Sequence, residues 1–424
     1  MQYKDYSKEQ LLEELEELKN SYDEIKSMGL KLNMARGVPS PDQLTLSLGI
    51  LNVLYAEADC RASDGTDCRN YGVMDGIPEC KRLMAELMGV SPDMVMIGGN
   101  SSLNMMFDTI ACFMNKPAVP GTPPWSLVPD RKFLCPVPGY DRHFGITGYF
   151  GFEMIPVPMD NNGPDMDVVE ELVKDPAVKG MWCVPKYSNP TGVTYSDETV
   201  RRIAALKPAA KDFRLMWDNA YCIHDLTDET DSLLDIFEEC EKTGNIDMPI
   251  EFCSTSKITF PGSGVAAMAA SENNMKVIKE KYKYQTIGYD KLNMLRHVRF
   301  FGDLDGMKAH MKKHAEVLRP RFDIVLKKLS EQLREYGIVW YNHPRGGYFV
   351  SVNVMDGTAK RVVELCKEAG VILTGAGATY PNGNDPFDSN IRVAPSYPSL
   401  EDLSKAMDVF CVCARLAAVE KLTA

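Results

Sequence analysis

The sequence lacks the features by which several classes of protein are recognised. No apolar run approaches the length needed to span a membrane, and the amino-terminal residues have no apolar core of the kind found in signal peptides. The net charge is −12 and no basic patch runs through the chain, which argues against a nucleic-acid partner. We therefore expect a cytoplasmic protein that binds neither membranes nor nucleic acids.

The 12 cysteines show no Cys-x-x-Cys pair and no regular spacing. Zinc sites and disulfide frameworks both need regular spacing, so we expect neither, and no metal site is predicted. Cys183, Cys411 and Cys413 lie within apolar segments, which is typical of buried, reduced thiols. The cysteine pattern thus also favours the cytoplasm.

The 424 residues exceed the usual size of a single domain, and they contain no internal repeat or low-complexity segment. Helix-like sequence alternates with apolar segments near Val95, Phe133, Glu153, Gly180, Arg214 and Glu251. This alternation predicts an α/β fold with a mainly parallel sheet that is covered by helices on both faces. In such sheets, ligands collect at the carboxyl ends of the strands.

The remaining segments suggest a second, smaller domain. Leucines at helical spacing predict an amphipathic helix over Lys8–Met28, and a long helix is expected over Leu304–Tyr336. Beyond it, Tyr348–Val352 and Asn390–Val393 are expected strands around a helix over Thr358–Glu368. We accordingly divide the chain into residues 1–50, a helix and segment that join the small domain, residues 51–305, a large cofactor-binding domain, and residues 306–424, a small α+β domain.

The segment Ser254-Thr255-Ser256-Lys257, followed by Pro261-Gly262, offers a lysine on a turn after a short strand. A lysine that is desolvated beside a cationic ring loses its proton near neutral pH and can form a Schiff base, which is how many enzymes hold pyridoxal phosphate. On the tetrapeptide alone, an ordinary solvated lysine is the better interpretation. The neighbouring motifs decide between the two.

Three further motifs supply groups that this cofactor needs. Asp218 ends the apolar run Arg214–Trp217 and can pair with a pyridinium nitrogen, which keeps the ring an electron sink. Tyr221 and Asn189, the latter in an Asn-Pro-Thr-Gly turn, can reach the phenolic oxygen of the ring. The turn Gly98-Gly99-Asn100-Ser101-Ser102 begins a helix whose free N–H groups suit a phosphate. Each motif alone also fits a capped turn or helix start.

In chain order, these pieces resemble the fold type I pyridoxal-phosphate aminotransferases, over nearly all of the chain beyond its amino-terminal helix. The resemblance implies a mainly parallel seven-stranded sheet in the large domain. It implies a ring-stacking role for Tyr140, support of Asp218 by His143, phosphate contacts from Asn100, Ser101, Ser102, Ser254 and Ser256, and α-carboxylate binding by Arg392. Tyr71 matches the tyrosine that reaches the phosphate of the neighbouring subunit, which implies a homodimer with shared active sites.

One position departs from the family pattern. The family usually carries an arginine shortly after the Schiff-base lysine, where this chain has Pro261-Gly262-Ser263-Gly264. The cofactor phosphate then lacks its usual bidentate partner. Lys291 or Arg296, from this subunit or its partner, is a candidate source of the missing charge, and a solvated basic helix face is the alternative interpretation.

This departure, together with Arg36-Gly37-Val38-Pro39 and Pro138-Gly139-Tyr140-Asp141-Arg142-His143, resembles a smaller subgroup, the bacterial type Ic (MocR-like) aspartate aminotransferases. The resemblance implies transfer of the amino group of L-aspartate, and of glutamate, to 2-oxoglutarate or oxaloacetate. It further implies a ping-pong aldimine mechanism in which Lys257, once displaced from the cofactor, acts as the base.

A dicarboxylic substrate needs a cation for each end, and guanidinium groups fit carboxylates better than ammonium groups do. Besides Arg392 for the α-carboxylate, we assign Arg142 to the distal carboxylate, with Arg36 in reserve. A structural ion pair with a neighbouring acid is the competing interpretation of Arg142. Gly37 would let the backbone approach the substrate, and Asn189 would also line the substrate pocket.

Three other functions are considered, of which the first two stay open. An aromatic or kynurenine-type aminotransferase would use the stacking tyrosine and several methionines around an aromatic substrate. A lyase or decarboxylase on the same fold would differ in which bond to Cα breaks. An effector-sensing domain of a transcription regulator would need an amino-terminal helix-turn-helix domain, and the first forty residues are too few and too acidic for one.

Overall fold

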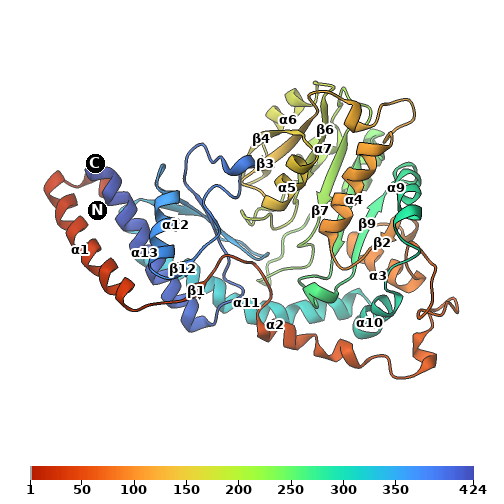
Figure 1. The fold of residues 1–424 in the computed structure, drawn as a ribbon, viewed down its shortest axis with the longest axis horizontal. Helices are drawn as coiled ribbons and strands as arrows, with labels where there is room; N and C mark the ends of the chain where they lie inside the picture. The colour runs from red at the N-terminus through yellow and green to blue at the C-terminus, as the bar shows by residue number, and fades with distance from the viewer. Residues whose placement is uncertain (1) are drawn as a thin grey trace.

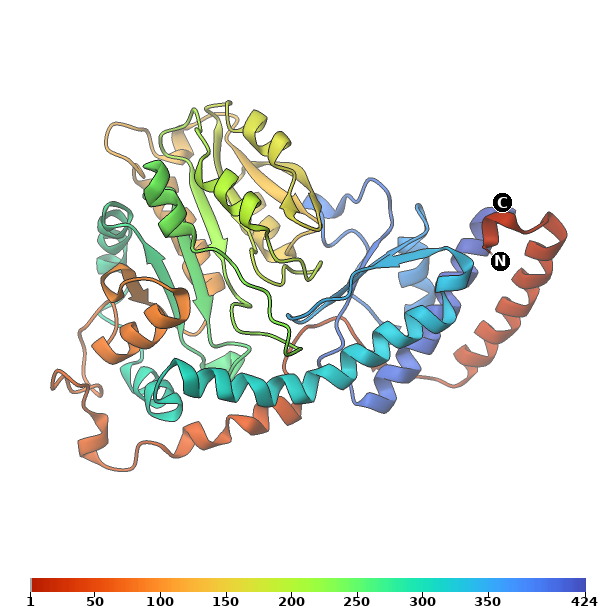
Figure 2. The ribbon, with the colours of Figure 1, turned by 180° about the vertical axis from the view of Figure 1, so that it is seen from behind.

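The chain forms a large domain around one eight-stranded sheet and a smaller domain that holds both ends of the chain (Figure 1). The structure is a computed structural model and describes residues 2–424. Helix α11 (Leu304–Gln332) runs beneath both domains, as the view from behind shows (Figure 2). The division into residues 1–50, 51–305 and 306–424 stays a prediction, because α11 is continuous across its second boundary.

The large sheet has the strand order β2-β9-β8-β7-β6-β3-β4-β5. Its strands are β2 (Val95–Ile97), β3 (Lys132–Val137), β4 (Glu153–Asp160), β5 (Gly163–Pro164), β6 (Val178–Cys183), β7 (Arg214–Asp218), β8 (Pro249–Ser254) and β9 (Ala266–Ala270). The five strands from β8 to β4 pair in parallel, whereas β9 is antiparallel to both of its neighbours. The predicted mainly parallel sheet is confirmed, with the two-residue β5 as an addition to the seven strands expected.

Helices cover both faces of this sheet (Figure 1). On one face lie α3 (Pro78–Met88), α6 (Met166–Leu172), α7 (Asp197–Ala204), α8 (Ile236–Thr243) and α10 (Lys291–Phe301), and on the other lie α4 (Ser102–Asn115), α5 (Asp141–Tyr149) and α9 (Glu272–Gln285). Alternate side chains of β7 serve the two cores, since Leu215 and Trp217 pack on the first face and Met216 on the second. Asp218 shares the face of Met216, and this places its carboxylate toward α5.

The small domain is built from both ends of the chain. It contains an antiparallel sheet of β10 (Val339–Tyr341), β11 (Val350–Val354) and β13 (Asn390–Val393), a parallel pair of β1 (Leu32–Asn33) and β12 (Val371–Ile372), and the helices α1 (Lys8–Ser27), α12 (Ala359–Glu368) and α13 (Leu400–Thr423). Helix α1 buries Leu11, Leu18 and Tyr22, and the Tyr22 hydroxyl donates to the Leu365 carbonyl at 2.9 Å. Helix α2 (Pro41–Leu46) then leads toward the large domain.

The 3₁₀ turns are short and lie between the main elements. They are η1 (Tyr3–Asp5), η2 (Leu48–Asn52), η3 (Glu57–Cys60), η4 (Pro92–Met94), η5 (Trp125–Leu127), η6 (Pro261–Ser263), η7 (Arg334–Tyr336) and η8 (Pro381–Gly383). Turn η7 follows α11 and ends at Tyr336, the residue at which the sequence predicted the end of the long helix. Among residues 2–424, no helix combines the length and the apolar character that crossing a membrane requires.

Strand β9 is absent from the strands expected from the sequence. Its residues Ala266–Ala270 read Ala-Ala-Met-Ala-Ala, and all five are buried. Alanine favours helices, and the segment has no β-branched or aromatic side chain to indicate a strand. The small side chains instead allow helix α4 to pack closely on this part of the sheet.

Three buried histidines pack against the segment that carries Lys257. The Nε2 atom of His297 lies 3.1 Å from the hydroxyl oxygen of Thr255 and 2.9 Å from that of Thr259. The Nε2 atoms of His310 and His314 lie 3.0 Å apart on successive turns of α11. Burial lowers the pKa of all three imidazoles, to about 4 for His297 and His314. These histidines are therefore neutral in the folded protein at neutral pH.

We expect the free energy of unfolding to fall as the pH drops from 6.5 toward 4. Histidine in the unfolded chain takes up a proton near pH 6.5, whereas buried His297 does so only near pH 4. The stability is therefore complete above pH 6.5 and is lost below it, because the unfolded state binds protons first. For His297 alone, this linkage gives a loss of about 1.3 kcal/mol between pH 7.5 and 5.5.

Denaturant unfolding at these two pH values, at one protein concentration, measures the loss. In His297→Gln the difference between the two pH values should shrink by about that amount, since glutamine does not titrate. In His343→Gln, which changes an exposed histidine, it should stay the same. An undiminished difference in His297→Gln would show that His297 is not the titrating group.

Candidate active site

A buried carboxylate with one partnered and one unpartnered oxygen lies at the carboxyl end of β7. The Oδ2 atom of Asp218 lies 2.9 Å from Nε2 of His143. The imidazole of His143 stacks on the indole of Trp182, with ring centroids 4.1 Å apart and planes 5° from parallel. The Oδ1 atom of Asp218 is buried and has no hydrogen-bond partner among residues 2–424. Such an oxygen is costly to bury alone, and it is the acceptor that a ligand's N–H would satisfy.

Lys257 follows β8 and faces the same region. Its Nζ atom lies 4.9 Å from the ring centroid of Tyr221 and 6.0 Å from that of Tyr348. Burial raises the pKa of Tyr140 to about 12, while the nearby charge of Lys257 acts in the opposite direction. The charges of Tyr221 and Asp218 also raise the pKa of Tyr140. The lysine, the aspartate and both tyrosines therefore share one site.

Two turns meet beside Lys257 and are joined by hydrogen bonds. The Ser256 hydroxyl donates to the Asn100 carbonyl at 3.1 Å, and the Ser254 hydroxyl donates to that of Ser256 at 3.0 Å. Ser101 is the N-cap residue of helix α4, and its side chain makes no capping hydrogen bond, so the helix's free N–H groups start at the joined turns. A Cβ added at Gly264 would lie 3.3 Å from the Asn100 carbonyl oxygen. The position without the family's arginine thus borders the predicted phosphate site.

The candidate replacements for that arginine lie on α10. The side chain of Asn293 donates to the Gly264 carbonyl at 2.9 Å and so holds this helix against the turn. The buried Lys291 donates to the Gly72 carbonyl at 3.0 Å. Neither Lys291 nor Arg296 forms an ion pair with an acid in the part of the chain that the structure describes. The source of a positive charge for the phosphate stays a prediction.

Arg392 lies on β13 of the small domain and reaches the large domain. Its Nη1 atom donates to Oδ1 of Asp141 at 3.0 Å and to Oδ1 of Asn189 at 3.3 Å, and its guanidinium carbon lies 4.9 Å from the Phe349 ring centroid. Its Nε atom is buried without a partner among the described residues. A Cβ at Gly37 would come within 2.3 Å of the Phe349 ring. Because Gly37 has no side chain, the Phe349 ring has room to pack against Arg392.

The two arginines proposed for a distal carboxylate lie apart from Arg392. Arg142 is exposed and lines a hollow of about 520 Å³ together with residues of α4 such as Leu103 and Phe107. None of the side chains that contact Arg392 lines this hollow. Arg36 is exposed as well, and within residues 2–424 neither arginine has an acidic partner at ion-pair distance. The structure does not bring Arg142 to the side chains around Arg392.

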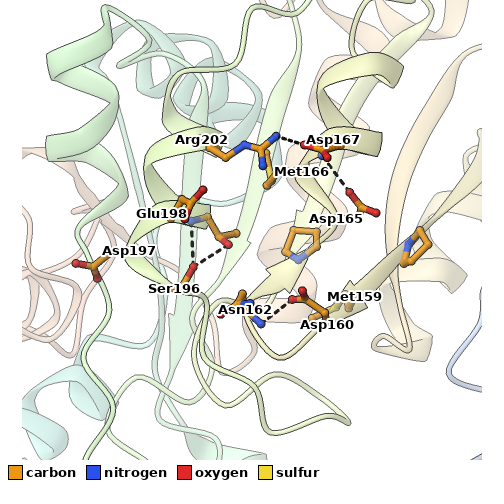
Figure 3. A pocket seen from close by; sticks show the side chains of 13 residues that line it. Met159, Asp160, Asn162, Asp165, Met166, Asp167, Ser196, Asp197, Glu198 and Arg202 are labelled. Carbon is orange, nitrogen blue, oxygen red and sulfur yellow. Dashed lines mark hydrogen bonds and ion pairs between the residues drawn. The ribbon is translucent and has the colours of Figure 1, made fainter.

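A separate hollow of about 550 Å³ lies at the edge of the sheet, between β4, β5, α6 and α7 (Figure 3). Five of its 13 lining residues are acidic, among them Asp160 and Asp165. Its arginine, Arg202, is already paired with Asp167 at 2.5 Å and with Glu170 at 2.8 Å. None of the predicted site residues lines this hollow, so it is distinct from the candidate active site.

Sequence reasoning missed several side chains that support the site. Asp141 and Trp182 lie in segments that drew attention for Tyr140 and for the apolar strand alone. Tyr348 is the first residue of the strand expected over Tyr348–Val352, and its hydroxyl accepts a hydrogen bond from Gln43 Nε2 at 2.8 Å. No local signal in the sequence marks Tyr348 as a site residue, because its partner Gln43 lies far away in the chain.

The family model described as aspartate amino-transferase matches residues 6–424. The chain belongs to the aspartate aminotransferase family. It is 49% identical to the aspartate aminotransferase of Corynebacterium glutamicum, over 96% of this chain and 94% of that protein. The predicted membership among the fold type I pyridoxal-phosphate aminotransferases is thereby confirmed, and the protein is an aminotransferase.

Solved structures agree with this assignment. The crystal structure of an aspartate transaminase from Corynebacterium glutamicum superposes with a TM-score of 0.97 at 48% identity, over 99% of both chains. A kynurenine aminotransferase of Pyrococcus horikoshii, solved in complex with PMP, reaches a TM-score of 0.74 at 20% identity, over 96% of this chain and 95% of that one. The second likeness shows the fold alone.

We expect His143→Phe to destabilise the protein by about 2 kcal/mol, because it removes the hydrogen bond to a buried carboxylate. Phenylalanine preserves an aromatic ring against Trp182, so the loss should come from the missing donor. His143→Gln retains a donor and should recover most of the stability. Denaturant unfolding of the two variants under matched conditions measures the difference, and a His143→Phe protein as stable as the wild type would refute this role.

Proposed function

We propose that the protein is a pyridoxal-phosphate-dependent aspartate aminotransferase that moves the amino group of L-aspartate, and of glutamate, to 2-oxoglutarate or oxaloacetate by ping-pong kinetics. The observation that carries the cofactor assignment is the buried, unpartnered Oδ1 of Asp218. A protonated pyridine nitrogen is a donor of the kind this oxygen lacks. The identity of 49% to an aspartate aminotransferase supports the choice of substrate.

The residues present fit this cofactor. Lys257 would hold its aldehyde carbon, Asp218 its ring nitrogen and Tyr140 one face of its ring. The turn at Asn100, Ser101 and Ser102, with the hydroxyls of Ser254 and Ser256, would hold its phosphate through neutral hydrogen bonds and helix N–H groups. When bound, the cofactor supplies an electron sink for the pair of electrons released at the substrate Cα.

Proton transfer in both half-reactions would belong to Lys257. Its free amine removes the proton from Cα of the bound amino acid in one half-reaction and returns a proton to Cα of the oxoacid in the other. Burial raises the pKa of Tyr221, with the charge of Asp218 acting in the same direction and that of Arg392 against it. Tyr221 therefore keeps its proton at neutral pH and can donate, beside the Asn189 amide, to the phenolic oxygen of the cofactor.

Substrate orientation would depend on Arg392, whose guanidinium suits the α-carboxylate. Phe349 packs beneath it, in the space left by Gly37. Asn189 adds a polar contact at the same end. For the distal carboxylate we retain Arg142 as the first candidate and Arg36 as the second, since both are cations without an acidic partner within residues 2–424.

We further propose a homodimer, located in the cytoplasm, with active sites shared between subunits. Large apolar side chains are exposed along the extended segment between α2 and α3, including Leu48, Leu51, Tyr55 and Tyr71. Tyr71 is 82% exposed, and a second subunit would cover it and bring it near the phosphate. Twofold pairing of this segment would complete each site with a residue of the other subunit.

We expect the purified protein to be coloured by bound pyridoxal phosphate and to change its visible spectrum when L-aspartate is added. Lys257→Ala should lose both the visible band and turnover while keeping its far-UV circular dichroism, because only the covalent attachment and the base are removed. Lys211→Ala, at an exposed lysine, serves as the control and should behave like the wild type. A protein that stays colourless after incubation with pyridoxal phosphate would overturn the cofactor assignment.

The products formed from L-aspartate distinguish transfer of the amino group from decarboxylation or lyase cleavage. Oxaloacetate should accumulate beyond one equivalent of enzyme only when 2-oxoglutarate is present, since ping-pong transfer needs the second substrate to regenerate the enzyme. Release of alanine or ammonia from aspartate in its absence would instead indicate a decarboxylase or lyase.

Replacing the residue that binds the distal carboxylate should discriminate between substrates. We expect Arg142→Leu to lower kcat/KM for L-aspartate by about 100-fold or more while leaving turnover of L-phenylalanine nearly unchanged, because only the dicarboxylate uses the cation. Arg36→Leu is the matched comparison and should have little effect. Selective loss in Arg36→Leu would transfer the role to Arg36, and equal losses for both amino acids would exclude a distal-carboxylate role.

A further inference from the structure

Arg392 already holds a carboxylate that belongs to the protein. Asp141, the first residue of α5, approaches Arg392 Nη1 at 3.0 Å. The arginine side chain is 8% exposed, whereas that of the aspartate is 36% exposed. The contact joins residues that are 251 positions apart in the chain and that belong to different domains. The fold therefore brings these two residues together, and Asp141 is the partner that is partly exposed to solvent.

The pairing conflicts with binding of a substrate carboxylate to the same guanidinium. Nη1 donates to both Asp141 and Asn189, so one arm of the guanidinium fork is occupied. A second carboxylate on Arg392 would also lie close to the negative charge of Asp141 in a poorly solvated place, which is unfavourable. The buried Nε atom, which has no partner among the described residues, shows that the guanidinium retains unused donor capacity.

The surroundings of Asp141 would also stabilise its negative charge away from Arg392. Its side chain is partly open to solvent, and it lies in the first turn of α5, where the helix dipole and free N–H groups stabilise a negative charge. Displacement from Arg392 therefore does not leave the carboxylate buried without a partner. Arg392, in contrast, is too buried to lose its anion without gaining another.

We propose that Asp141 is a specificity-determining residue that acts as a built-in competitor for the substrate α-carboxylate. It occupies Arg392 in the free enzyme and is exchanged for the carboxylate of the amino acid or oxoacid on binding. Small anions and weakly held ligands are thereby kept off the guanidinium, since only a ligand with further contacts displaces an attached carboxylate. This inference rests on the proposed function, in which Arg392 binds the α-carboxylate.

The test compares the holoenzyme with Asp141→Asn, which keeps the shape and polarity of the side chain but removes its charge. Binding of maleate, an unreactive dicarboxylate, is measured by calorimetry, and KM and kcat are measured with L-aspartate and L-glutamate. We expect Asp141→Asn to bind maleate about three- to tenfold more tightly and to lower both KM values by a similar factor, with a smaller change in kcat. Chloride should become a stronger competitive inhibitor of the variant.

Two further variants serve as controls. Asp141→Glu retains the charge and should keep the maleate affinity near the wild-type value. Asp160→Asn, which removes a charge from the separate acidic hollow, should leave binding unchanged. Unchanged or weaker maleate binding in Asp141→Asn would overturn the proposal and assign Asp141 the structural role of orienting Arg392.

The outcomes are distinguishable from a failure of the proposed function. A wild-type holoenzyme whose visible spectrum responds to no amino acid would contradict the aminotransferase site itself. A wild-type enzyme that responds to L-aspartate while Asp141→Asn binds maleate no more tightly would contradict only the competitor role of Asp141.

Discussion

The active site depends on one buried negative charge, the carboxylate of Asp218. Removing a carboxylate from water is expensive unless hydrogen bonds replace the lost hydration. His143 supplies one such bond at 2.9 Å, and the parallel stack on Trp182 holds the imidazole in place. The other oxygen has no partner among the described residues, so the site is incomplete without a donor from a ligand. A pyridinium nitrogen would supply that donor and would also explain why the charge is retained.

The sheet explains why residues distant in the chain meet at this charge. Strands β6, β7 and β8 run in parallel, so Asp218 at the end of β7 lies near Asn189 and Lys257, which follow the carboxyl ends of β6 and β8. Their convergence could be predicted from sequence because each follows a recognisable apolar strand. The turn that we propose for the phosphate has similar local signals, since a strand, two glycines and a helix start are all visible in the sequence.

Contacts across the domain boundary could not be predicted in this way. Nothing in the sequence around Asp141 indicates a partner on β13, and Gln43 and Tyr348 are likewise separated by most of the chain. The direction of the Arg142 side chain likewise follows from its position beside Asp141 on α5. Successive residues of a helix point about 100° apart, so once Asp141 faces Arg392, its neighbour faces the side of α4. Strand β9 escaped prediction because alanines carry no strand signal.

The pairing of Arg392 also bears on how the two domains are held together. Arg392 belongs to the small domain, and both of its polar partners, Asp141 and Asn189, belong to the large one. A substrate carboxylate that replaces Asp141 would release one of these cross-domain contacts, while the hydrogen bond from Arg392 to Asn189 can persist. Binding therefore need not break every contact between the domains to gain access to the guanidinium. A bare arginine at this position would have to remain solvated in the free enzyme, and the burial of Arg392 excludes that arrangement.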